Sequence, residues 1–198
     1  LNWDRFRYTY PRWGRDRVNG PVIPTAMEGP VPDWRAIAID SRAACDQYPV
    51  DPSNPDDRLR LQSYIWADQT ARMERLNAAL KLSHQSGLKV EKADAAEWVK
   101  RKLAGELPVG TTVIYHSVFY QYPPRDGRIG IAEAIEEAGT RANSDRRLAW
   151  VRFEPESVIG PRGSPRYVLN VVSWDTGVRS EATLAEADPH GRSLVWAT

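Results

Sequence analysis

VIYHSVFYQYPP, the stretch from Val113 to Pro124, decides how the fold of this chain is predicted. An apolar run leads into a histidine, a serine and two tyrosines, and the double proline that follows ends the strand. In an open α/β sheet, ligands bind beyond the carboxyl ends of the strands. The stretch therefore predicts a strand whose polar end lies at the rim of a binding crevice.

Helices and strands alternate on both sides of this strand. Upstream, apolar residues recur at helical spacing over 67–87, and KVEKA (89–93) then leads as a strand into a helix over 97–103. Downstream, a helix is predicted from Asp126 to Gly139, and RLAWVRFEP (147–155) follows as a strand. This βαβαβ order predicts an α/β fold with a mostly parallel sheet and helices on both faces.

Strands near each end of the chain are predicted to pair with their sequence neighbours in the antiparallel direction. DRFRYTY (4–10) alternates as a half-buried strand does, and Asn19-Gly20 is a turn signal that returns the chain through Val22 and Ile23. The last three predicted strands, YVLNVVSW, VRSEATLAEA and SLVWA, have no helix between them. AIAID (36–40) fits a short strand and a short helix equally well. We expect one domain, with an antiparallel excursion over 1–30, an α/β core over 31–155 and antiparallel strands over 156–198.

Composition excludes several classes of partner. The 27 Lys and Arg residues balance 26 Asp and Glu residues, so no basic field favours nucleic acid. No apolar run is long enough to span a membrane, and no signal peptide is recognisable. The one cysteine, Cys45, rules out an internal disulfide, and three scattered histidines do not predict a metal site. These features predict a cytoplasmic protein without nucleic-acid or membrane partners and leave its oligomeric state open.

Polar residues follow three of the predicted core strands. Asp46 and Asp51 end the first extended segment, Asp94 ends the second, and His116 begins the polar end of the third. Carboxylates at neighbouring strand ends suit a nucleoside, with Asp46 or Asp51 on the ribose hydroxyls and Asp94 near the adenine. Simpler roles compete with these. Asp94 is favoured as the N-cap of its helix, and aspartates among prolines commonly order their own turns.

His116 and Tyr120 are the catalytic candidates, and Ser117 joins the aspartates as a cofactor-binding candidate. A neutral imidazole near pH 7 suits a general base or an orienting group, although a core histidine bonded to a backbone carbonyl fits the pattern equally well. Ser117 is not a nucleophile elbow, because the G-x-S-x-G frame is absent. No phosphate-binding loop, G-x-G-x-x-G or H-E-x-x-H motif occurs.

Several motifs together resemble an uncharacterised bacterial family, the domain of unknown function numbered twenty-three thirty-two. The first motif, R-x-G-x-D-x-x-P-x-D, is matched at Arg42, Asp46, Pro49 and Asp51. The second, W-x-D-x-x-x-R-x-x-R-L, is matched at Trp66, Asp68, Arg72, Arg75 and Leu76. The third is a His-Ser strand end, matched at His116 and Ser117. The resemblance covers nearly the whole chain. Ala44 and Cys45 depart from it, since the family tends to have glycine there.

The resemblance implies a Rossmann-like fold similar to class I methyltransferases, with S-adenosylmethionine as cofactor and a small molecule as substrate. Leu1-Asn2 resembles the tail of a Gly/Ser-rich segment that the family carries upstream, so the first strand and the glycine turn are expected to be missing. The signature of amine methylation is absent from HSVFYQYPP, which disfavours an exocyclic amine as acceptor. The alternative is a non-catalytic binding or scaffold domain that keeps this fold.

Overall fold

The computed structural model describes residues 2–8, 20–30, 32, 37–160 and 164–197. These residues form two compact units. The first unit comprises Leu1–Thr25 and Pro32–Ala93, and the second comprises Ala26–Val31 and Asp94–Thr198. The expectation of a single domain stays a prediction, and each unit is described by itself.

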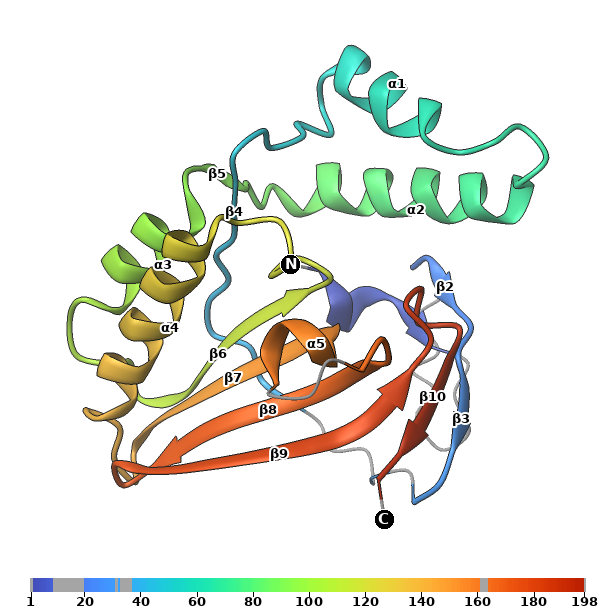
Figure 1. The fold of residues 1–198 in the computed structure, drawn as a ribbon. Coiled ribbons are helices and arrows are strands. Elements are labelled where there is room, and N and C mark those ends of the chain that lie inside the picture. The colour runs from blue at the N-terminus through green and yellow to red at the C-terminus, as the bar shows by residue number, and fades with distance from the viewer. Residues whose placement is uncertain (1, 9–19, 31, 33–36, 161–163, 198) are drawn as a thin grey trace. The chain divides into compact units, whose positions relative to one another are not determined.

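Among its described residues, the first unit contains a 3-10 helix, two α-helices and two small sheets (Figure 1). Its elements are a 3-10 helix η1 (Trp3–Arg5), β1 (Arg7–Tyr8), β2 (Val22–Ile23), β4 (Cys45–Asp46), α1 (Pro55–Ser63), α2 (Thr70–Ser86) and β5 (Glu91–Lys92). The prediction of an antiparallel excursion was wrong here, because β1 and β2 pair in parallel. Residues 9–21 between them are long enough for the crossover that parallel strands need. Tyr10 and Asn19 lie outside the described residues.

Local sequence signals explain the two helices of the first unit. Pro55 begins α1, and the Asn54 side chain caps it by accepting a hydrogen bond from the Asp56 amide. The longer helix α2 ends at Gly87, whose φ of 66° is left-handed, as the sequence predicted. Residues 37–40 of the ambiguous AIAID stretch adopt no regular secondary structure, and Ala36 lies outside the described part of the chain.

The second unit is built on a six-stranded sheet with the order β3-β10-β9-β8-β7-β6 (Figure 1). Its elements are β3 (Ala26–Glu28), α3 (Ala95–Leu103), β6 (Gly110–Ser117), α4 (Arg125–Gly139), β7 (Arg146–Pro155), α5 (Glu156–Ile159), β8 (Tyr167–Asp175), β9 (Val178–Ala187) and β10 (Ser193–Trp196). The helices α3 and α4 and the strands β6 to β10 lie close to the predicted ranges. The short helix α5 was not predicted.

The prediction of a mostly parallel, Rossmann-like sheet was wrong. Parallel pairing occurs only between β6 and β7 and between β10 and β3 in this sheet, while β7 to β10 pair as an antiparallel meander. The two strands β4 and β5 form a separate parallel pair. The reason is that β4 and β5 do not join the sheet that contains β6, so only two of its strand pairs are parallel. The antiparallel pairing predicted for the last three strands is confirmed, and Thr176 and Gly177, both with positive φ, turn β8 directly into β9.

Helices α3 and α4 lie side by side and enclose the core of the second unit with one face of the sheet (Figure 1). Alternate residues of β7 and β8 point to this covered face, and the buried apolar set includes Trp98, Val99, Leu103, Ile131, Ile135, Ala138, Leu148, Trp150, Val172 and Trp174. The contact between α4 and the sheet is close, because a Cβ atom at Gly139 would lie 2.4 Å from the Trp174 ring. Only glycine fits there without repacking.

Candidate functional site

The end of β6 places two neighbouring candidate residues on opposite faces of the sheet. Burial alternates along β6, with Ile114 and His116 half-buried and Tyr115 and Ser117 exposed. Because successive side chains of a strand point to opposite faces, His116 lies on the face that the helices cover and Ser117 on the other. The structure therefore does not bring Ser117 and His116 into one site.

The partner of His116 is Glu154, near the end of the adjacent strand β7. The parallel register aligns His116 with Arg152, and Glu154, two residues further on, points to the same covered face. One carboxylate oxygen, Oε1, lies 2.6 Å from Nδ1 of His116 and also accepts the backbone N–H of Phe119 at 2.9 Å. The Glu154 side chain is fully buried. The site is thus a buried carboxylate–imidazole pair that spans two strands.

The 2.6 Å contact between Nδ1 and Oε1 is compatible with a proton on Nδ1 that the Glu154 carboxylate accepts. A carboxylate that accepts the Nδ1–H leaves Nε2 of a neutral imidazole with a free lone pair, which is the atom that a general base uses. Nε2 of His116 is buried and has no hydrogen-bonding partner among the residues that the structure describes, and the same holds for Oε2 of Glu154. Buried polar atoms without partners are uncommon in native proteins, and each needs an explanation. Other buried atoms of this chain, such as Oγ1 of Thr112 and Nε1 of Trp150, also lack partners among the described residues.

Aromatic rings enclose the His116 imidazole. Tyr120 stacks on it with centroids 5.0 Å apart and an interplanar angle of 17°, while Phe119 and Trp150 approach it at 5.7 and 5.9 Å. The Tyr120 hydroxyl donates to the Arg128 carbonyl at 2.6 Å, and burial raises the pKa of this phenol. Tyr120 therefore contacts the candidate base through its ring, whereas its hydroxyl group is engaged elsewhere.

The connection after β6 contains a backbone outlier. Val118 has a φ of 48°, in the left-handed region that β-branched residues avoid. Its amide donates to the Phe153 carbonyl at 2.8 Å, and the next amide, that of Phe119, turns toward Glu154. Strained residues of this kind cluster at functional sites and persist only where surrounding contacts hold them. Here the buried carboxylate is one of those contacts.

A second charged group, Arg152, is buried next to this pair. Its guanidinium lies 4.5 Å from the Trp150 ring centroid, bonds to Oδ1 of Asn170 at 3.0 and 2.6 Å, and donates to Glu181 at 2.7 Å. Burial lowers the pKa of Arg152, and the neighbouring Glu181 carboxylate opposes that shift. The covered face of the sheet thus carries two networks of charged side chains, centred on Glu154 and on Arg152.

The other predicted site residues lie in local turns and caps. Asp46 accepts the Tyr48 amide at 2.7 Å. Asp51 accepts the amide and hydroxyl of Ser53, and these hydrogen bonds lower the pKa of its carboxyl group. Asp94 caps α3 by accepting two amide hydrogen bonds, as the sequence indicated. Asp46 and Asp51 belong to the first unit and Asp94 to the second, and their role in cofactor binding stays a prediction.

Sequence reasoning missed Glu154 and Arg152. The signal was present in RLAWVRFEP, because Leu148, Trp150, Arg152 and Glu154 share one face of an alternating strand. Two charged residues in line with a leucine and a tryptophan indicate buried charges that need partners. His116 lies in the adjacent strand and was the available partner.

Comparisons with known proteins give one match. A family model described as an uncharacterized protein conserved in bacteria (DUF2332) matches residues 1–196. No curated protein and no solved structure matches the chain. Among the described residues, no group of three or more His, Cys, Asp or Glu side chains is arranged to hold a metal ion. Within that same part of the chain, no helix is long and apolar enough to cross a membrane.

Proposed function

The chain belongs to this uncharacterised bacterial family, DUF2332, and we propose that its second unit binds a small molecule that carries a hydroxyl group and deprotonates it with His116. The observation that carries the proposal is the buried Nε2 of His116, which has no hydrogen-bonding partner among the described residues, on a ring whose Nδ1 lies 2.6 Å from Glu154. A carboxylate placed in this way stabilises the imidazolium that forms when the ring takes up a proton.

Ligand binding at Nε2 requires the surrounding side chains to move, because this atom is covered in the structure. The segment Val118–Pro124, which includes the strained Val118 and leads into α4, covers the imidazole with Phe119 and Tyr120. A rearrangement of this segment would relieve the backbone strain and expose the ring. The proposal therefore includes a change in the position of Tyr120 on binding.

S-adenosylmethionine stays a prediction from the sequence. Each predicted cofactor residue has a local place in the structure: Asp46 and Asp51 each use one oxygen in their own turn, Asp94 caps α3, and Ser117 lies on the opposite face from His116. The mostly parallel sheet that favoured this cofactor is also contradicted. Calorimetry with S-adenosylhomocysteine tests the cofactor separately from the His116 site.

Nuclear magnetic resonance of the imidazole rings tests the proposal, because the chain has three histidines whose ring resonances can be distinguished. Diethyl pyrocarbonate acylates neutral imidazoles that it can reach, and a panel of small alcohols and phenols probes binding. We expect acylation of His116 in the native protein, and we expect a fragment that shifts its ring resonances and protects it. His116→Ala should abolish that binding and His190→Ala should not. No acylation of native His116 together with no fragment effect would refute the proposal.

A non-catalytic scaffold is the second candidate, because one observation favours it. The His116 side chain is only 10% exposed and lies among three aromatic rings, as a structural histidine would. In that role the pair with Glu154 fastens the connection between β6 and α4 onto β7. The scaffold role predicts that His116→Ala loses stability and that no fragment shifts the His116 ring resonances of the unmodified protein.

A further inference from the structure

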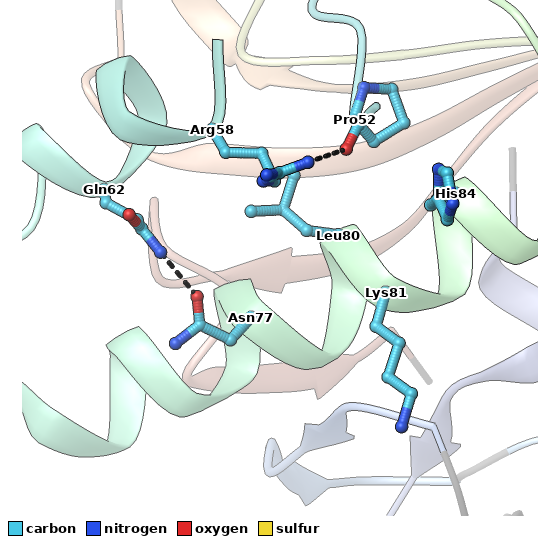
Figure 2. Close-up of a pocket in the computed structure, with 7 residues that line it drawn as sticks. All are labelled: Pro52, Arg58, Gln62, Asn77, Leu80, Lys81 and His84. Carbon is cyan, nitrogen blue, oxygen red and sulfur yellow. Dashed lines mark hydrogen bonds between the residues drawn. The ribbon is translucent and has the colours of Figure 1, made fainter. Parts of the chain in front are cut away.

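A cavity of about 250 Å³ lies between α1 and α2 in the first unit (Figure 2). We propose that this α1–α2 cavity binds the phosphate group of a small phosphorylated molecule. Its volume is below the roughly 300–1,000 Å³ of pockets for drug-sized ligands, which suits a small ligand. The site does not depend on the function proposed for His116.

The spacing of polar residues on the two helices creates the cavity. Arg58 and Gln62 are one turn apart on α1, and Asn77, Lys81 and His84 follow one another on one face of α2. Leu80, the buried residue of α2, also lines the cavity. Helices that pack together for stability alone usually face each other with apolar side chains. Most of the side chains between α1 and α2 at this cavity are instead polar or cationic.

Arg58 is held in a fixed orientation. Its Nη1 donates to the Pro52 carbonyl at 3.0 Å and to the Ser53 carbonyl at 3.2 Å. Figure 2 shows the guanidinium directed toward Pro52 above Leu80. Nε and Nη2 have no hydrogen-bonding partner in the described part of the chain. A preoriented guanidinium with unused donors is the group that most often recognises phosphate in two-point contacts.

The remaining lining groups also offer donors. Gln62 Nε2 donates to Asn77 Oδ1 at 2.9 Å, which joins the helices and leaves the Asn77 amino group available. The His84 ring is directed toward the Pro52 end of the cavity in Figure 2. Lys81 extends away from Arg58 in the same view, and its flexible four-carbon side chain must turn back for the ammonium to reach a ligand.

None of the described residues that line this cavity carries a carboxylate. Two acidic groups close to the lining residues in the sequence are engaged: Asp51 accepts hydrogen bonds from Ser53, and Asp57 accepts the Asp51 amide at 2.8 Å and pairs with Arg60. The pKa of Asp51 is lowered mainly by the Ser53 hydrogen bonds and, to a smaller extent, by the nearby Lys89 and His84. The lining thus presents donors and positive charge, with Asp51 as an acidic neighbour of its His84 end, and a ligand rich in acceptor oxygens and negative charge complements the lining.

Nuclear magnetic resonance titration of the isotope-labelled full chain tests this site. The probes are glycerol 3-phosphate, inorganic phosphate and acetate, at constant ionic strength. We expect saturable shifts of amides between Asn77 and His84 with glycerol 3-phosphate, and weaker binding of acetate. Lys81→Glu should weaken glycerol 3-phosphate binding at least tenfold and Arg58→Lys several-fold. Lys100→Glu, at an exposed position of α3, is the matched charge control and should leave the affinity unchanged.

The outcomes separate the possibilities. Shifts that do not saturate, or equal weakening by Lys81→Glu and Lys100→Glu, would show general attraction of anions and overturn the proposal. Acetate binding as tightly as glycerol 3-phosphate would overturn the assignment to phosphate. Lys81→Gln, which removes the charge without reversing it, should weaken binding in the same direction, and circular dichroism checks that each variant is folded.

Discussion

Replacement of Glu154 tests how the candidate site is held together. The carboxylate is fully buried and accepts two hydrogen bonds through one oxygen, from His116 Nδ1–H and from the Phe119 amide. Glu154→Leu leaves both donors buried without an acceptor, at a cost of roughly 1–3 kcal/mol each. Removing a buried charge that needed solvation offsets part of this cost. We expect a net loss of about 3 kcal/mol.

Two further variants separate charge from hydrogen bonding. Glu154→Gln keeps a carbonyl oxygen that can accept both donors and loses only the charge, so we expect a loss of about 1 kcal/mol. His116→Phe leaves Glu154 as a buried charge without its main partner and should cost roughly 3–5 kcal/mol. In the double variant His116→Phe/Glu154→Leu both polar partners are absent, and the loss should fall short of the sum of the single losses by about 2 kcal/mol.

Urea unfolding followed by tryptophan fluorescence measures these differences in the free energy of unfolding. Thermal unfolding should agree, with about 2–4 °C in Tm per kcal/mol for a chain of this length. Glu133→Gln, on the exposed face of α4, is the control and should change stability by less than about 0.5 kcal/mol. Additive losses in the double variant, or a Glu154→Leu loss below about 1 kcal/mol, would refute the pairing.

Three other measurements follow from the second unit. Gly139→Ala should destabilise the protein by about 1–3 kcal/mol, because the new methyl group would lie 2.4 Å from the Trp174 ring. Gly130→Ala should instead stabilise α4 by about 0.5–1 kcal/mol, because the nearest atom to its new methyl group lies 3.5 Å away. Urea unfolding measures the stability of both variants. Burial raises the pKa of Glu181, but hydrogen bonds and charges from two arginines outweigh burial and lower it below the ordinary 4.5. Its contribution to stability is therefore complete above that value and is lost as the pH falls through the lowered pKa, so the stability difference between wild type and Glu181→Gln should shrink between pH 7 and pH 3. Asp94→Ala should cost about 1 kcal/mol through loss of the cap of α3, while Asp94→Asn, which keeps a capping oxygen, should cost much less in the same assay.

The helices could be predicted because their signals are local. Gly87 ends α2, Asp94 begins α3, and Ile131 and Ile135 recur at helical spacing in α4, so each range follows from a few neighbouring residues. The pairing of strands is not local. Nothing in a strand's own alternation indicates which strand it will lie beside, and the alternation of helices and strands wrongly suggested that β5 continues the sheet of β6.

The two candidate sites show the same limit. His116 was predicted from its place at a strand end, whereas Glu154, thirty-eight residues further along the chain, was interpreted only as part of a strand. The α1–α2 cavity combines residues from two helices, and His84 looked like an ordinary surface residue in its own context. Local patterns identified His116 in the first site and no residue of the α1–α2 cavity, and tertiary structure was needed to identify the rest.

The direct turn at Thr176 and Gly177 has a consequence for the order in which the second unit folds. It brings Asp175 and Val178 together across a minimal loop, whereas the contact between His116 and Glu154 closes a segment of thirty-eight residues that contains α4. The longer closure costs about 2 kcal/mol more in chain entropy. The hairpin of β8 and β9 can therefore form early, and β6 joins later, when α4 and β7 are in place. On this route the carboxylate–imidazole pair forms among the last contacts, and the His116 ring reports that folding is complete.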